Sequence, residues 1–177
     1  NANANGTLID HFTYAISDGT QAGVQYGRVD FSISAVNDVP TLNATADATV
    51  PEGTVHAVSL GLDEGGGSYE NAQGLKLRIT SSNPAMVDAT TGITASWGAS
   101  AMAQNGSVHT LGDVSFDASS KSVNLSITPV SSTLSGASTI TLEVSDDNGI
   151  TWGATDSFIL TYAAVDDAPV FSILNNG

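Results

Sequence analysis

Strict alternation of apolar and polar residues is the feature that most constrains how this chain can fold. In the stretch RVDFSISAV at 28–36, Val29, Phe31 and Ile33 share one face, while polar residues share the other. The same period of two recurs at 11–17, 54–60, 75–80, 122–128, 139–145 and 157–165. Stretches of this kind, rich in Val, Ile, Thr and aromatic residues and separated by Gly/Asp/Asn turns, are typical of half-buried β-strands. The chain is therefore predicted to be all-β.

Two similar segments divide the chain. The same order of elements occurs twice: a strand, an acidic turn that contains glycine, a second alternating strand and then a linker. The two linkers are AVNDVPTL at 35–42 and AVDDAPVF at 164–171. A supersecondary unit repeated at a long interval predicts a tandem array. We therefore divide the chain into a partial unit at 1–38, a complete unit at 39–167 and the start of a following unit at 168–177.

The complete unit is long enough for about seven strands, which fits a Greek-key β-sandwich of the immunoglobulin or cadherin type. The hairpin within residues 1–38 is not expected to be stable alone, because an isolated two-stranded hairpin is marginal in water. The first interpretation is a fragment of a longer repetitive protein. The alternative is a subunit of an extracellular filament whose incomplete end is completed by a strand from a neighbour.

The charge of the chain is strongly one-sided. It carries 18 Asp and Glu against 4 Lys and Arg, a net charge of -14 at pH 7, and no Cys. Nucleic acids and anionic membranes need a cationic partner surface, so neither is expected to bind. Without Cys there is no disulfide framework or thiolate zinc site, and no apolar run approaches the ~20 residues of a membrane-spanning helix. Most carboxylates must therefore lie in water or hold an external cation.

The acidic residues are expected to gather at the two ends of the sandwich. When the complete unit is threaded as strands A to G, the B–C loop, the F–G loop and the incoming linker lie at one end. The A–B turn and the outgoing linker lie at the other end. At the first end the candidate metal ligands are Asn37, Asp38, Asp63, Glu64, Glu70, Asn71, Asp146, Asp147 and Asn148. At the second end they are Glu52, Asp166 and Asp167.

Clustered carboxylates repel one another unless a cation compensates them. Calcium (Ca2+) is the natural candidate, because it takes about 6–8 oxygen ligands from carboxylates, amides, carbonyls and water in irregular loops. Three scattered His residues and the lack of Cys argue against zinc or copper. The alternative is that the acidic residues only keep the protein soluble and that Asp-Asn-Gly simply forms a turn.

No catalytic constellation stands out in the sequence. The three histidines lie in stretches predicted to be strands, where a surface or cross-strand histidine is expected: His11, His56 and His109. The neighbouring acidic residues that could act as a catalytic carboxylate pair lie in Gly-rich segments. These segments lack the apolar side chains that would raise the pKa of a general acid. The chain is therefore expected not to be an enzyme. Trp152, beside the F–G loop, is either a cover over the core or a stacking platform for carbohydrate; a ligand-binding module and an accessory domain of an extracellular enzyme are the alternative functions.

The order of these motifs resembles a known family. The strand–SDG–strand–VNDVP text is similar to the end of bacterial cadherin-like and VCBS-type tandem repeats. LDEGGGSYENAQGLKLRITSSNPAMV, followed by TLEVSDDNG and VDDAP, resembles a cadherin-like repeat of very large bacterial surface adhesins of the RTX type. The resemblance covers nearly the whole chain. It implies a calcium-rigidified extender module in an extracellular or cell-surface adhesin, with neighbouring repeats as partners and a host-surface or matrix carbohydrate or protein as a further partner.

The resemblance also implies roles for individual residues. It matches the interdomain ligands to Asn37, Asp38, Asp166 and Asp167, the base glutamate to Glu52, and the loop of the next module to Asp63 and Glu64. The linkers are shorter than the D-x-N-D-N form of cadherins, and the stretch 128–138 has no acidic residue. Fewer ions at each junction than in true cadherins are therefore expected.

Overall fold

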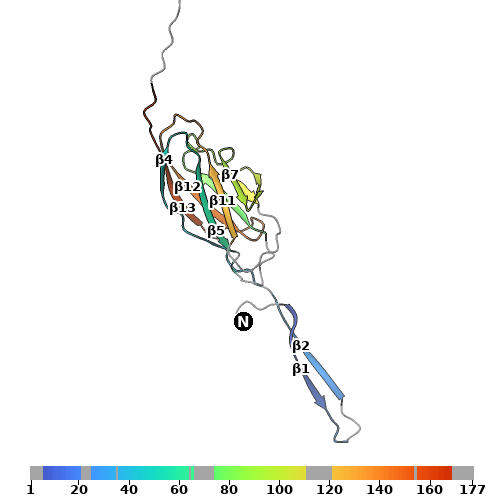
Figure 1. Cartoon of the computed structure of the whole chain (residues 1–177). Coiled ribbons are helices and arrows are strands. Elements are labelled where there is room, and N and C mark those ends of the chain that lie inside the picture. Colours follow the sequence, from blue (N-terminus) through green and yellow to red (C-terminus); the bar gives the residue numbers. More distant parts are fainter. Residues whose placement is uncertain are drawn as a thin grey trace, which may run out of the picture.

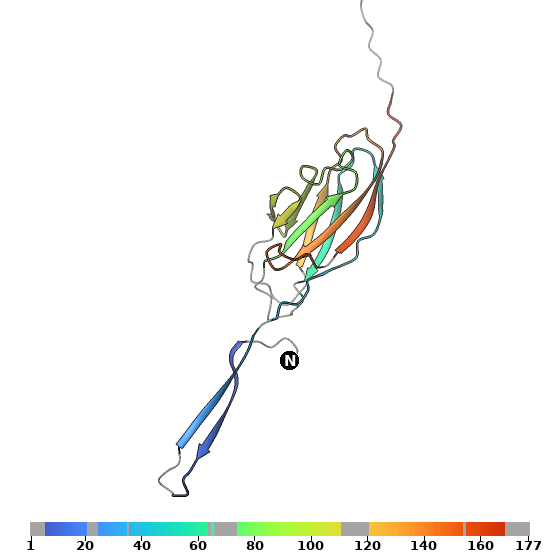
Figure 2. The same ribbon diagram turned by 180° about the vertical axis from the view of Figure 1, so that it is seen from behind.

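The computed structural model describes residues 6–20, 25–34, 36–63, 65, 74–110, 121–153 and 155–168. Within these residues the regular secondary structure consists of strands, which confirms the predicted all-β class. A two-stranded hairpin projects from one end of a two-sheet sandwich, and the described chain leaves at the opposite end (Figure 1; Figure 2). Among the described residues there is no helix long and apolar enough to cross a bilayer.

The strands fall into the hairpin and the sandwich. The hairpin consists of β1 (Gly6–Ile16) and β2 (Gln25–Ile33). The sandwich contains β3 (Thr41–Leu42), β4 (Ala48–Pro51), β5 (His56–Asp63), β6 (Lys76–Ser81), β7 (Ile93–Trp97), β8 (Ser100–Ala101), β9 (Ala103–Asn105), β10 (Val108–Thr110), β11 (Lys121–Ile127), β12 (Gly136–Ser145) and β13 (Thr155–Ala163).

The sandwich has the strand arrangement of an immunoglobulin-like domain. One sheet has the order β4-β13-β12-β6-β10-β9 and the other the order β3-β5-β11-β7-β8. The first strand of the unit is split: β3 pairs with β5 in one sheet, while β4 runs parallel to β13 in the other. The chain crosses between sheets from β5 to β6, and β12 and β13 form a hairpin. These features match the predicted Greek-key sandwich.

The core lies between the two sheets and follows the period of two. Along β12, Ile140, Leu142 and Val144 are fully buried, while the residues between them are partly exposed. Burying one such side chain stabilises the fold by about 1.5–3 kcal/mol. The inward residues of the remaining strands complete one cluster, with members that include Leu60, Leu62, Leu77, Ile79, Ile93, Val123, Leu125, Ile127, Phe158, Leu160 and Tyr162. The alternation in the sequence is therefore the pattern of this core.

The hairpin β1–β2 repeats the strand pairing of β12–β13. The sequence at 12–18 aligns with 140–146 at the strand and its Ser-Asp turn, and the linker at 36–40 aligns with 165–169. Under this alignment the cross-strand pairs correspond: Phe12–Val29 with Ile140–Phe158, Thr13–Arg28 with Thr141–Ser157, Tyr14–Gly27 with Leu142–Asp156, and His11–Asp30 with Thr139–Ile159. The repeat seen in the sequence thus extends to the register of the strands.

Candidate functional site

The incoming linker and the β12–β13 turn meet at one end of the sandwich. The Asn37 side-chain amide donates from Nδ2 to Asp146 Oδ1 at 3.0 Å, which ties the linker to the end of β12. A Cβ built on Gly153 would lie 2.6 Å from Val39 Cγ1, so the linker passes closely over the β12–β13 turn at Gly153, two positions before β13 begins. We call this end, which carries Asn37, Asp38, Asp63, Asp146, Asp147 and Asn148, the linker pole.

The end of β5 reaches the same pole. The Gly65 N–H donates to Asp63 Oδ1 at 2.8 Å. Gly65 has a φ of 105°, and a Cβ built on it would lie 2.6 Å from the Val39 carbonyl oxygen and 3.1 Å from Asp38 Cβ. Only glycine fits this close approach, which places Asp38 next to the loop that Asp63 begins. The predicted ligands Glu64, Glu70 and Asn71 lie outside the described residues.

Asp146 is the least exposed acidic side chain at the linker pole. It is 7% exposed. Its Oδ1 accepts the hydrogen bond from Asn37, but its Oδ2 is buried and has no hydrogen-bond partner among the described residues. Leaving a buried carboxylate oxygen without a partner is costly, because the charge loses water and gains nothing in return. A cation or an ordered water at this oxygen would remove that cost.

Asp147 and Asn148 serve the turn itself. Asp147 accepts hydrogen bonds from the Ser145 hydroxyl, the Ile150 N–H, and the N–H and hydroxyl of Thr151. These bonds, above all the one from the Thr151 side chain, lower the pKa of Asp147 to about 2. Asn148 has a φ of 66°, a conformation that Asn tolerates better than most residues. Two neighbouring carboxylates, Asp146 and Asp147, therefore have different surroundings.

Two basic residues of β6 make polar contacts near the linker pole. Lys76 Nζ donates to the Asn148 carbonyl at 2.9 Å. Arg78 makes a bidentate pair with Glu143 at 2.6 and 2.7 Å, which lowers the pKa of Glu143. The role of these two basic residues was not predicted from the sequence, although the alternation in LKLRIT already places both on the outward face of a strand. They are two of the four basic residues in the chain.

Arg78 also bears on the carbohydrate hypothesis for Trp152. Its guanidinium carbon lies 4.2 Å from the centroid of the Trp152 ring, a cation–π distance. One face of the indole is therefore occupied by a side chain that Glu143 holds in place. This arrangement favours a packing role for Trp152 over a stacking platform. Trp97 is partly buried and packs against the core.

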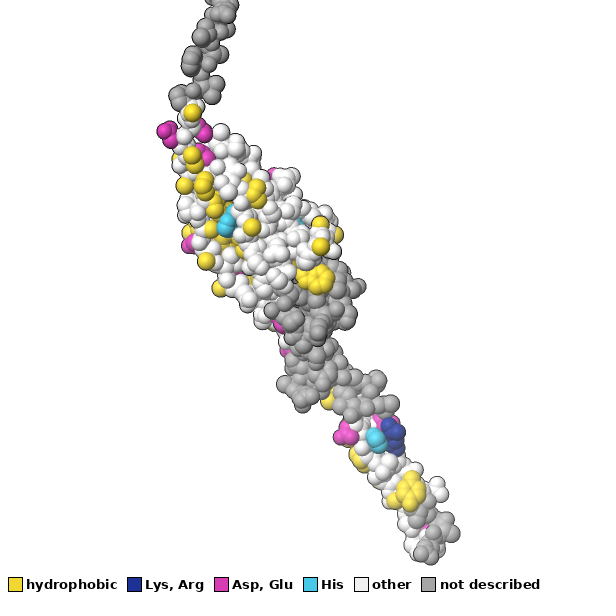
Figure 3. Space-filling view, viewed as in Figure 1, with side chains coloured by type: hydrophobic (Ala, Val, Ile, Leu, Met, Phe, Trp, Pro, Cys, Tyr) yellow, Lys and Arg dark blue, Asp and Glu magenta, His cyan; other side chains and the backbone are white. Residues whose placement is uncertain are grey.

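The other predicted ligands lie at the opposite end, which we call the exit pole. Glu52 accepts a hydrogen bond at Oε1 from the Val165 N–H, at 2.8 Å, and thereby holds the outgoing linker. Asp166 and Asp167 follow it and are exposed. Figure 3 shows acidic side chains gathered at this end. Among the described residues, at either pole, no three Asp, Glu or His side chains stand close enough together to hold a metal ion by themselves.

Gly65→Ala should test how tightly the linker is held at the pole. The left-handed φ costs an alanine roughly 1–2 kcal/mol, and its Cβ would also collide with the Val39 carbonyl. Gly98→Ala is the matched control, because Gly98 has a φ of 56° but nothing within 4 Å of a built Cβ. In hydrogen exchange, Gly65→Ala should speed exchange at the linker pole and Gly98→Ala should not. Equal effects would mean that the linker is not clamped there.

Comparisons with known proteins identify a fold. No protein-family model matches the chain, and no curated protein matches its sequence. Among solved structures, CfaE, the adhesive subunit of the CFA/I fimbria of enterotoxigenic Escherichia coli, matches with a TM-score of 0.50 and 11% identity. The match covers 89% of this chain and 59% of CfaE, so the chain spans less than two thirds of that protein.

A second adhesin has a weaker likeness. The CupB6 tip adhesin from Pseudomonas aeruginosa matches with a TM-score of 0.36 and 9% identity, over 86% of this chain and 54% of CupB6. A family 123 glycoside hydrolase from Clostridium perfringens has a TM-score of 0.43 and 12% identity, over 70% of this chain and 23% of the enzyme. These two likenesses are too weak to add to the match with CfaE, which shows the fold alone: an immunoglobulin-like β-sandwich.

Proposed function

We propose that the chain is an extender module of a secreted or cell-surface bacterial adhesin, in which calcium stiffens the joints between successive sandwiches. The fold that it shares with an adhesin subunit supports this role, as does the sequence resemblance to cadherin-like repeats. Its partners are the neighbouring repeats of the same protein. It has no catalytic role in this proposal, and it spaces other domains away from the cell surface.

The observation that carries the calcium proposal is the state of Asp146. One of its carboxylate oxygens binds the linker through Asn37, and the other is buried without a partner among the described residues. A cation at that oxygen would compensate a charge that the fold leaves unpaired, and it would do so where the linker meets the sandwich. Binding there would couple calcium directly to the angle of the joint.

The residues at the linker pole fit a calcium ion in their chemistry. Asn37, Asp38, Asp63 and Asp146 offer amide and carboxylate oxygens from three separate segments, and backbone carbonyls and water complete such sites. Asp147 supports the turn with oxygens that already accept hydrogen bonds from four donor groups. At the exit pole, Glu52, Asp166 and Asp167 would form the corresponding set with the next module. Calcium at ten times its dissociation constant would stabilise each site by about 1.4 kcal/mol.

Thermal melts with excess calcium and with chelator should test the proposal. The melting temperature of the wild-type chain should rise in calcium and fall back in chelator. Asp146→Asn should abolish the shift, because it removes the charge that faces the ion. Asp147→Asn is the matched control: it weakens the turn and lowers the melting temperature, yet it should keep the calcium-dependent shift.

Small-angle scattering of the same samples tests the stiffening. The hairpin and the sandwich are joined through the linker pole, so a flexible joint gives the chain a range of maximum dimensions. Calcium should narrow that range in the wild-type chain. No shift in melting temperature would leave solubility as the role of the acidic residues. A shift that Asp146→Asn keeps would move the site away from Asp146, and unchanged scattering would remove the extender mechanism.

A further inference from the structure

The hairpin β1–β2 exposes an apolar face. Phe12, Tyr14 and Ile16 are 50%, 44% and 62% exposed, and the facing strand adds Phe31 and Ile33, which are about as exposed. The aromatic rings stay together, with the Phe12 centroid 6.4 Å from that of Tyr14 and 5.9 Å from that of Phe31. A continuous apolar face of this kind marks an interaction surface.

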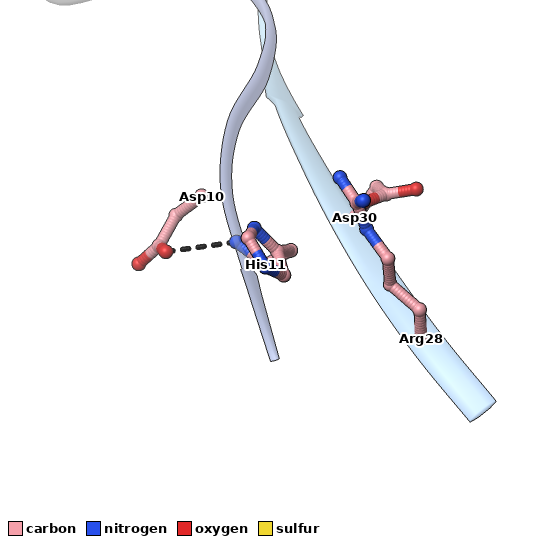
Figure 4. Close-up of polar contacts among 4 residues, drawn as sticks. All are labelled: Asp10, His11, Arg28 and Asp30. Carbon is pink, nitrogen blue, oxygen red and sulfur yellow. Dashed lines mark hydrogen bonds and ion pairs between the residues drawn. The ribbon is translucent and has the colours of Figure 1, made fainter. Parts of the chain in front are cut away.

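The opposite face of the hairpin is polar. Figure 4 shows His11, Arg28 and Asp30 on this face. Asp10, which pairs with Phe31 and so belongs to the other face, accepts a hydrogen bond at Oδ1 from the His11 N–H, at 2.8 Å. Arg28 forms an ion pair with Asp30 along β2. His11 and Asp30 face each other across the strands and are exposed. The hairpin therefore has one side suited to water and one side suited to a partner.

The register of the hairpin identifies that partner. Phe12, Tyr14 and Ile16 occupy the positions of Ile140, Leu142 and Val144, each of which is 0% exposed in the sandwich. Those residues are covered by the sheet β3-β5-β11-β7-β8. In the same sandwich β6 pairs with the free edge of β12, and β4 pairs with that of β13. Among the described residues, the hairpin forms a sheet of two strands and has neither neighbour.

We infer that the apolar face of β1–β2 docks on a five-stranded sheet of the same kind as β3-β5-β11-β7-β8, supplied by another repeat of this protein. The hairpin is then the last hairpin of that repeat's sandwich, and strands equivalent to β6 and β4 pair with its two edges. This inference rests on the tandem arrangement in the proposed function, but it does not depend on calcium. A second copy of this chain, docked through the same hairpin face, is the rival occupant.

A chimera can supply the proposed partner sheet. Residues 39–138 are placed directly before His11, so that the chain reads 39–138 followed by 11–168. Ser138 is equivalent to Asp10, so this junction keeps the register of the hairpin. With chelator present, the backbone amides of β1 and β2 should exchange on the order of 100-fold more slowly than in the wild-type chain, because exchange then requires opening of a folded sandwich.

Matched variants of the chimera show which face is covered. Tyr14→Glu should remove the protection, because it places a charge at the position of the buried Leu142. Ala15→Glu should keep it, because Ala15 corresponds to Glu143, which lies on the outer face. A further control chimera carries the residues of β12 and β13 at the inward positions of β1 and β2, and it establishes that the junction itself allows folding.

Three results would overturn the inference. The first is rapid exchange of the hairpin in a chimera whose second sandwich is folded, while the control chimera is protected. The second is equal loss of protection in Tyr14→Glu and Ala15→Glu. The third is a dimer of the wild-type chain, seen by sedimentation, that protects the hairpin as strongly as the chimera does; in that case the occupant is a second copy.

Discussion

Ile140→Ala is expected to lower the free energy of unfolding by about 2–5 kcal/mol, since it leaves a cavity in a packed core. Ile140 is fully buried between the two sheets. Phe12→Ala changes the matching position of the first hairpin, where the ring is half exposed. It should therefore leave the main transition of the sandwich within about 0.5 kcal/mol of wild type. Urea denaturation followed by circular dichroism measures both values.

Comparing Ile140→Ala with Phe12→Ala shows whether the hairpin contributes to the free energy of unfolding of the sandwich. The dependence of the free energy on urea should be the same in the two proteins, because neither variant changes the area that the sandwich exposes on unfolding. If Phe12→Ala costs as much as Ile140→Ala, the hairpin packs into the same cooperative unit, contrary to the architecture described above. In the chimera with a supplied partner sheet, Phe12→Ala should instead carry a core-sized cost.

The long strands could be predicted from the sequence because they carry several periods of the alternation. β2, β5, β11, β12 and β13 each correspond to an alternating stretch. The strands that sequence reasoning missed or left without bounds are mostly short: β3 and β8 have two residues, and β9 and β10 have three. A two- or three-residue strand contains no measurable period, so only its pairing partners define it.

The arrangement of the acidic residues could be predicted only to the level of the two poles. Threading places the linker, the end of β5 and the β12–β13 turn together, and the contacts of Asn37 and Gly65 agree with that arrangement. The difference between Asp146 and Asp147 could not be predicted. Both are acidic residues in one turn, and only the folded backbone shows that Thr151 satisfies the second while the first is buried. The basic residues Lys76 and Arg78 were likewise invisible as partners until β6 was placed beside β12.

His109 supplies the second large effect, a pH-dependent loss of stability. It lies on β10 opposite Leu77 of β6, and it is 0% exposed. Neither ring nitrogen has a hydrogen-bond partner among the described residues. Burial lowers the pKa of His109 below its ordinary value of 6.5. Lys76 and Arg78 flank Leu77 on β6, so by strand alternation they point to the other face.

The lowered pKa determines the direction of the pH effect. Below about pH 6.5 the unfolded chain takes up a proton at His109 that the folded chain does not. The contribution of the neutral histidine is therefore fully present above that pH and is lost as the pH falls towards the lowered pKa of the folded state. The loss approaches about 1.4 kcal/mol for each pH unit. Other groups of the chain also gain protons as the pH falls, so the effect must be read as a difference from a variant.

His109→Leu is the informative variant. At pH 7.5 it should raise the free energy of unfolding by about 1–3 kcal/mol, because it removes two buried nitrogens without partners. It should also flatten the fall in stability between pH 7.5 and 5.5. His56→Gln is the control for the loss of a histidine, because His56 is only partly buried at the start of β5, and its stability is measured over the same pH range. One result would contradict this prediction: His109→Leu is less stable than wild type at pH 7.5 and keeps the wild-type dependence of stability on pH. The buried imidazole would then be hydrogen-bonded in the folded protein, and the pH dependence would come from other groups.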